Sequence, residues 1–164
     1  MFQFTYHIDM KKTFYLIFAV GILAFSTTMH AQDISNRVLS LEDAQRISDA
    51  AMSRAMQDSW NVVIAVLDGG GHLVSLRRMD GTQIGSVDVA LKKAETALKF
   101  KRPSKVFEDA VKSGNLHILS LPGIVAVEGG LPIMQEGRPI GSIGISGVTS
   151  AQDGIIAAAG LEAF

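Results

Sequence analysis

The sequence contains no cysteine, and this absence removes several classes of site. A chain of 164 residues without a thiol forms no disulfide, carries no thiolate nucleophile and supplies no ligand to an iron–sulfur cluster or a cysteine-bound zinc. No charge of one sign dominates either, because 15 Lys and Arg stand against 16 Asp and Glu, for a net charge of −1. Nucleic acid is therefore not expected as a partner.

The common nucleotide and serine-nucleophile motifs are also absent. No G-x-x-x-x-G-K-[ST] occurs, and the glycines of 141–147 read G-x-x-G-x-x-G inside an expected strand, not G-x-G-x-x-G at a strand-to-helix turn. Ser146 lacks the second glycine of a nucleophile elbow, since Val148 holds that place. The glycines instead predict a strand surface that a helix, a subunit or a flat ligand approaches closely.

The N-terminal residues predict an export signal. Lys11 and Lys12 precede an apolar run over 14–25 that is short for a membrane span, and small polar residues follow it. We expect translation from Met10 and cleavage after Ala31, with an uncleaved N-terminal anchor as the alternative. Residues 1–31 are thus a predicted signal peptide, and residues 32–164 a single periplasmic or secreted domain without a stable membrane span.

The remaining residues predict an α+β domain. Helical spacing occurs over 41–58, 87–101, 105–113 and 151–163, and apolar or alternating runs predict strands at 62–67, 72–79, 124–127, 131–135 and 140–146. Ser40 with Asp43, and Ser150 with Asp153, match capping boxes. Because short turns join neighbouring strands, we expect a five-stranded antiparallel sheet with helices packed on it, in the order αββα(α)βββα.

Only two histidines, His72 and His117, follow the expected signal. His72 comes after the turn at 68–71, at the start of a strand, where an imidazole can reach a ligand; a solvated turn histidine is the alternative reading. An axial haem ligand needs an accessible nitrogen, an apolar wall and basic groups for the propionates. His117 has apolar neighbours in the sequence, and we expect it in the core.

Basic residues near His72 are candidates for binding an anion. Arg78 shares the strand face of His72 by parity, while Met79 is either a sulfur ligand or a core residue. The expected second helix and the residues just after it carry a basic stripe, which is either an anion site or a solvated face. The stripe consists of Lys92, Lys93, Lys99, Lys101 and Arg102. The aspartates near turns, Asp68, Asp80 and Asp153, are expected to bind backbone amides.

Five segments in order resemble the HbpS-like haem-binding family, which includes the GlcG proteins and the C-terminal domain of PduO-type proteins. They are 68–74 (DGGGHLV), 78–81 (RMDG), 93–97 (KAETA), 129–133 (GGLPI) and 141–147 (GSIGISG). The resemblance implies a profilin-like fold, self-assembly into dimers or larger rings, and binding of haem or a related tetrapyrrole, with haem degradation reported for the family as a class. Gly154 stands where many relatives place a glutamate.

Together, the residues and the resemblance predict an exported, homo-oligomeric haem-binding protein that sequesters or degrades haem. We expect His72 as the axial ligand and Arg78 or Lys93 at the propionates, around one opening. Met79, Gly129 and Gly130 complete the expected binding residues. The alternative is a GlcG-like protein or enzyme acting on a small organic acid, whose carboxylate would bind Arg78, Lys93 and the amides of Gly129 and Gly130. A purely structural oligomeric module is a third reading.

Overall fold

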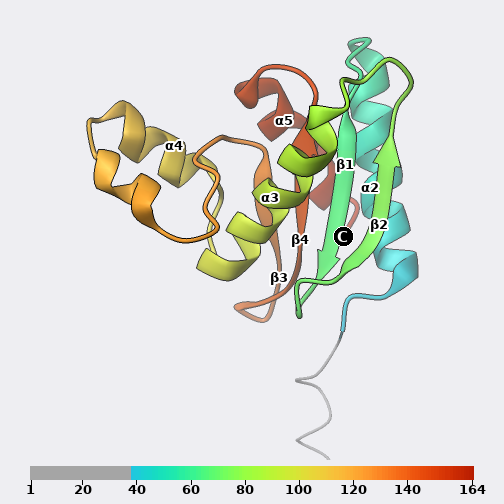
Figure 1. Ribbon diagram of the computed structural model, residues 1–164. Coiled ribbons are helices and arrows are strands. Elements are labelled where there is room, and N and C mark those ends of the chain that lie inside the picture. The colour runs from blue at the N-terminus through green and yellow to red at the C-terminus, as the bar shows by residue number, and fades with distance from the viewer. Residues whose placement is uncertain (1–37) are drawn as a thin grey trace, which may run out of the picture. The chain divides into compact units, whose positions relative to one another are not determined.

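The computed structural model describes residues 38–164, and the predicted signal peptide at 1–31 lies outside them. The described residues form one α+β unit around a four-stranded antiparallel sheet (Figure 1). Its elements are α2 (Leu41–Gln57), β1 (Val63–Asp68), β2 (Leu73–Arg78), α3 (Gly85–Phe100), α4 (Lys105–Lys112), the 3-10 helix η1 (Leu116–Ser120), β3 (Gly130–Gln135), β4 (Arg138–Ser146) and α5 (Ser150–Leu161). None of the helices within 38–164 is long and apolar enough to cross a bilayer.

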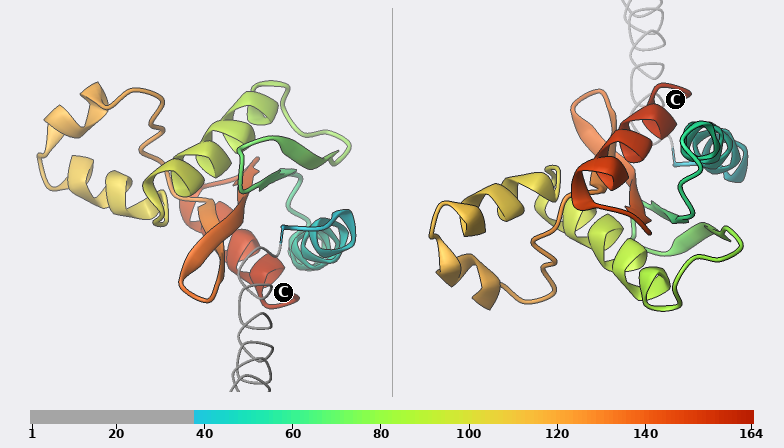
Figure 2. Two further views of the ribbon diagram at one scale, coloured as in Figure 1. Left: turned by 90° about the horizontal axis from the view of Figure 1, so that it is seen from below. Right: turned by 90° about the horizontal axis from the view of Figure 1, so that it is seen from above.

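The sheet lies between two helical layers. Its strand order is β2-β1-β4-β3, with every neighbouring pair antiparallel. Helices α2 and α5 cover one face and α3 crosses the other, while α4 and η1 extend away from the sheet (Figure 2). The β3–β4 hairpin is the one expected from the sequence. Its two-residue turn has positive φ at Glu136 (49°) and Gly137 (77°), which suits the twist of the strands.

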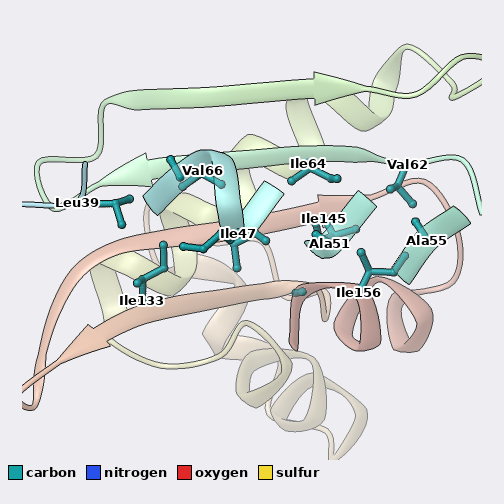
Figure 3. Packing of buried hydrophobic residues seen from close by; sticks show 13 residues of the cluster. Leu39, Ile47, Ala51, Ala55, Val62, Ile64, Val66, Ile133, Ile145 and Ile156 are labelled. Carbon is teal, nitrogen blue, oxygen red and sulfur yellow. The ribbon is translucent and has the colours of Figure 1, made fainter. Parts of the chain in front are cut away.

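The alternation of side chains along β1 divides the core between the two faces. Ile64 and Val66 point toward α2 and α5, where they pack with Ile47, Ile145 and Ile156 (Figure 3). Val63 and Ala65 point the other way, toward Ala90 of α3. Burying a large apolar side chain contributes about 1.5–3 kcal/mol, so the layer of isoleucines and valines is the main source of stability.

Helix α3 lies unusually close to the sheet because β4 carries a glycine beneath it. A Cβ at Gly144 would lie 2.0 Å from the carbonyl oxygen of Ala90 and 3.0 Å from the Cβ of Ala94. No side chain fits there. The close approach predicted from the strand glycines is therefore made at Gly144 by a helix.

The prediction of five strands is wrong, because 124–127 forms no strand. The backbone N–H of Val125 donates to Oγ1 of Thr96 on α3 (2.9 Å), so this segment follows the helix instead of joining the sheet. The neighbouring His117 lies on η1 and is exposed, not buried in the core as its apolar neighbours suggested. Apolar runs at these two places thus lie outside the main core.

The helix caps were predicted with mixed success. The capping box of Ser40 with Asp43 is confirmed. At α5 the box is one residue earlier, at Thr149 with Gln152, and this frees Asp153 to point into the protein. Ser104 makes no cap; its hydroxyl instead donates to the carbonyl oxygen of Val127 (2.7 Å) and accepts from the N–H of Gly130 (2.9 Å).

Candidate functional site: a basic cavity beside His72

An open cavity of about 510 Å³ lies where the C-terminal end of α3 meets the β1–β2 turn and the first residues of β4. We call it the basic cavity. It is lined by Gly69, Gly70, Gly71, Leu98, Lys99, Lys101, Arg138 and Pro139. Three cationic side chains therefore surround a wall made of glycine backbone, one leucine and one proline.

Strand pairing brings these distant segments together. Asp68, the last residue of β1, pairs with Gly141 of β4, so the turn after β1 lies beside the start of β4. The turn is held by Asp68, whose Oδ1 accepts the N–H groups of Gly70 and His72, both at 2.9 Å. Gly71 takes a φ of 84°, and a Cβ there would lie 3.7 Å from Leu98. A side chain at 71 would thus narrow the cavity.

Helix α3 ends at the cavity in a left-handed cap. Lys101 has a φ of 54°, and its N–H donates to the carbonyl oxygens of Ala97 and Leu98, while the N–H of Arg102 donates to Ala97. These bonds satisfy carbonyl groups that would otherwise present partial negative charge at the helix end. The cap therefore lets Lys101 project beside the cavity without an opposing row of free carbonyls.

Two of the three cations at the cavity have no counter-ion among residues 38–164. The Nζ of Lys99 lies 2.9 Å from Glu95, whose pKa is raised by burial but lowered overall by its bonds to Lys99 and Lys92. Lys101 and Arg138 make no ion pair with any residue of 38–164. The basic cavity is thus an unneutralised positive site, which favours an anionic ligand.

His72 stands next to the cavity, at the end of its glycine turn. Its side chain is 83% exposed, and its Nδ1 lies 3.3 Å from Oδ1 of Asp68. The N–H of His72, and to a smaller extent that of Gly70 and the imidazole itself, hold the pKa of Asp68 below its ordinary value. The imidazole therefore lies at the surface with a carboxylate near Nδ1, and metal-binding histidines often have a carboxylate beside the ring nitrogen that does not bind the metal.

Gly70 provides the space in which the imidazole lies. A Cβ at this position would lie 2.8 Å from Nδ1 and 2.9 Å from Cε1 of His72. The flexible histidine, not the backbone, would have to move if that space were filled. Gly70 therefore fixes where His72 lies relative to Asp68.

Arg78 and Met79 do not lie near this cavity. Arg78 ends β2 and Met79 follows it, six and seven residues beyond His72, which is about 20 Å along an extended strand. Arg78 is exposed opposite Val63, and Met79 packs partly buried against the main core. Sharing a strand face did not bring Arg78 close to His72.

Lys93, Gly129 and Gly130 meet in a second place, which is closed. The Nζ of Lys93 lies 2.7 Å from Oδ2 of Asp153, and the two side chains are 1% and 2% exposed. A Cβ at Gly129 would lie 2.9 Å from that Nζ, and one at Gly130 would lie 2.2 Å from the carbonyl oxygen of Lys93. We call Lys93, Gly129, Gly130 and Asp153 together the buried crossing. Burial raises the pKa of Asp153, against the lowering effect of Lys93.

The structure therefore does not gather His72, Arg78 and Lys93 around one opening. Of the predicted basic stripe, Lys99 and Lys101 reach the basic cavity while Lys93 is enclosed. The helical spacing indicates that Lys93 is buried, because it falls within the buried series of Ala90, Ala94 and Ala97. Arg138 was missed, since only the pairing of β1 with β4 brings it to the turn at 69–71.

Glu128 is a second residue that was not predicted from the sequence. A Cβ at Gly154 would lie 2.4 Å from Oε1 of Glu128, so this carboxylate fills the space above the glycine. Within 38–164 no three His, Asp or Glu residues cluster in a way that would hold a metal ion.

The chain resembles known proteins in both sequence and fold. A family model described as "Haem degrading protein HbpS-like" matches residues 39–162. The chain is 38% identical over 109 residues to Protein GlcG of Escherichia coli K12, and the match covers 66% of this chain and 81% of GlcG.

Two solved structures share the fold at similar levels. A crystal structure of a PduOC–heme complex is 31% identical with a TM-score of 0.71, and the match covers 78% of this chain and 96% of the other. A crystal structure of HbpS is 27% identical with a TM-score of 0.72, and covers 82% of this chain and 96% of the other. The first of these was solved with haem bound.

Proposed function

Because the chain belongs to the HbpS-like family, we propose that it binds haem and that the basic cavity with His72 is the binding site. The observation that carries the proposal is the juxtaposition of an exposed imidazole beside Asp68 with two cations across a glycine turn that make no ion pair within 38–164. The likeness to a protein solved as a heme complex supports the choice of ligand.

The residues at the cavity fit the parts of a haem molecule. Its two propionates require cations, which Lys101 and Arg138 supply. Its apolar ring requires an apolar wall, for which Leu98 and Pro139 are present, and a volume of about 510 Å³ is within the range of small-molecule sites. Its iron requires a nitrogen, which Nε2 of His72 can offer. Bound haem would supply redox chemistry at its iron, and this chain would hold and orient it.

Hemin titration of residues 32–164 tests the proposal. We expect a shifted Soret band at stoichiometric hemin, and we expect His72→Ala to weaken it. His117→Ala is the matched control, because it removes the other exposed imidazole of 38–164 at a site on η1. Absence of a Soret shift in the wild type contradicts haem binding, and an unchanged spectrum in His72→Ala contradicts His72 as the ligand.

Sequestration and degradation are separated by the fate of bound hemin. We propose binding as the function, with degradation as a further step that the family description names. A stable Soret band in the presence of a peroxide or a reductant with oxygen indicates sequestration. Its decay, faster than that of free hemin and with release of iron, indicates degradation.

Binding of a small organic acid is the second candidate, and the unpaired Lys101 and Arg138 favour it. These two cations can hold a carboxylate without any ring, and GlcG is among the relatives. Thermal shift against a panel of short hydroxy acids tests this, because a ligand at 100 times its Kd adds about 2.7 kcal/mol to stability. No shift across the panel excludes it.

We also propose that the chain is exported and that it assembles with copies of itself. The charged and apolar pattern of residues 11–28 supports export, and N-terminal sequencing of the mature protein should find Gln32 first. Exposed apolar side chains on the α4–η1 arm, including Leu116, Leu119 and Leu121, support an interface with a second copy. Light scattering should give an oligomer that Leu119→Ser weakens.

A further inference from the structure

We propose that the basic cavity recognises the two propionates of a tetrapyrrole and not its metal, so that it also binds metal-free and ring-opened tetrapyrroles that carry the same carboxylates. This inference rests on the proposed function and extends its ligand class. It follows from three features of the cavity: which groups can bind an anion, where the imidazole lies, and what the wall is made of.

Anion recognition at the cavity falls to side chains. A glycine turn often binds anions through its N–H groups, but here Asp68 already accepts two of them. The N–H of Gly70 donates to the carboxylate of Asp68, and that of Gly71 donates to its backbone oxygen (3.0 Å). The remaining cations without a counter-ion are Lys101, at the end of α3, and Arg138, at the start of β4. Two cations from two elements suit two carboxylates.

The imidazole is placed beside the cavity and does not line it. His72 is absent from the cavity wall, its side chain is 83% exposed, and its ring is held over Gly70 toward Asp68. Among the described residues no group of three or more His, Asp or Glu side chains could hold a metal ion there, and the carboxylate beside His72 belongs to Asp68 of the same turn. Ligation of iron is therefore an addition at the edge of the site, and the carboxylate contacts can form without it.

The wall places few demands on the shape of the ligand. Three of its eight residues are glycines that present backbone only, and the cavity is open to solvent. Leu98 and Pro139 supply apolar contact, but no aromatic ring is present to select a rigid flat disk. An opened, non-planar tetrapyrrole keeps the two propionates and can meet the same cations.

The test uses the full mature chain. It compares hemin with three ligands that each lack one of its features. Protoporphyrin IX lacks the metal, biliverdin lacks the closed ring, and hemin dimethyl ester lacks the free carboxylates. Quenching of intrinsic fluorescence from Trp60 and changes in ligand absorbance or emission report binding. We expect protoporphyrin IX and biliverdin to bind within about tenfold of hemin, and hemin dimethyl ester at least about tenfold more weakly, which is about 1.4 kcal/mol.

Variants assign the effect to residues. Arg138→Ala and Lys101→Gly should each weaken protoporphyrin IX binding about tenfold, while His72→Ala should leave it unchanged and alter only the Soret band of hemin. Lys92→Ala is the matched control. It removes one positive charge from α3, outside the cavity wall, where Lys92 pairs with Glu95.

The outcomes distinguish this inference from the proposed function. If hemin binds but protoporphyrin IX does not, or if the dimethyl ester binds as well as hemin, haem binding stands and carboxylate recognition is overturned. If Lys92→Ala weakens binding as much as Arg138→Ala, net charge and not the cavity is responsible, which also overturns the inference. If hemin itself fails to bind, both proposals fall.

Discussion

Lys93 and Lys99 lie six residues apart on α3 and have opposite surroundings. Lys99 is exposed at the basic cavity and pairs with Glu95 in solvent, whereas Lys93 is enclosed at the buried crossing and pairs with Asp153. Six residues turn a helix by about 600°, which leaves the two side chains about 120° apart around the axis. One helix therefore supplies a cation for binding at its end and a structural cation at its middle.

The difference shows that a lysine's role here is set by what faces it and not by its local sequence. At the buried crossing, two desolvated charges are compensated by each other, and removal of either leaves the other uncompensated. At the basic cavity, the cations are exposed, so they remain hydrated and cost the fold little. Stability should therefore respond to changes at the crossing, and ligand binding to changes at the cavity.

The largest expected effect is that of Lys93→Met. It leaves Asp153 buried without a cation, and we expect a loss of about 3–5 kcal/mol in the free energy of unfolding at pH 7 by urea denaturation. Burial raises the pKa of Asp153, so folding favours its protonated form and the cost of burying the charge appears as the pH rises. The deficit of the variant should therefore shrink as the pH is lowered toward 4.

A double variant checks the cause of that loss. Lys93→Met with Asp153→Asn removes both charges, and it should recover part of the stability that the single variant loses. Equal losses in the single and double variants would show that packing, and not the uncompensated carboxylate, is responsible.

The second prediction makes the same substitution in both regions. Gly130→Ala would place a Cβ 2.2 Å from the backbone oxygen of Lys93, so the backbone must shift, and we expect a loss of about 1–3 kcal/mol. Gly70→Ala meets chiefly the ring of His72, which can rotate away. Its loss should be below about 0.5 kcal/mol, with a changed hemin spectrum. Equal losses in thermal unfolding would remove the distinction between a closed and an open region.

The capping box at Ser40, the β3–β4 hairpin and the order of the helices could be predicted, because each depends on residues close in sequence. The buried ion pair could not, since Asp153 was assigned to the first turn of its own helix, and Lys93 to a basic stripe in which it was expected to bind a ligand. Likewise, the expected strand at 124–127 has the right residue types, but Thr96 of α3 accepts its N–H group. Long-range partners, which spacing does not reveal, decided these cases.

The third prediction is a gain in stability at the basic cavity. Lys101 has a φ of 54°, a conformation that costs a residue with a Cβ about 1–2 kcal/mol. Lys101→Gly removes this cost, and we expect a gain of about 1 kcal/mol in urea denaturation together with weaker ligand binding. A variant that is both destabilised and weak in binding would mean that Lys101 supports the helix end.

The smallest expected effect is that of Asp68→Ala. Its hydrogen bonds to the turn are near the surface, and we expect a loss of about 0.5–1 kcal/mol at pH 7. The pKa of Asp68 is lowered by folding, so its contribution is present above the unfolded value of about 3.9 and disappears as the pH falls through the folded value. Wild type and variant should therefore converge in thermal unfolding as the pH is lowered through the folded pKa of Asp68. A constant difference would assign the loss to turn geometry.

The absence of a side chain at Gly144 has a consequence for the kinetics of ligand binding. Helix α3 sits directly on strand backbone there, with no layer of adjustable side chains between them, so it has little freedom to slide or tilt. The end of that helix forms one wall of the basic cavity, which is therefore shaped before any ligand arrives. Association should proceed as a single concentration-dependent phase, without a slower step of rearrangement.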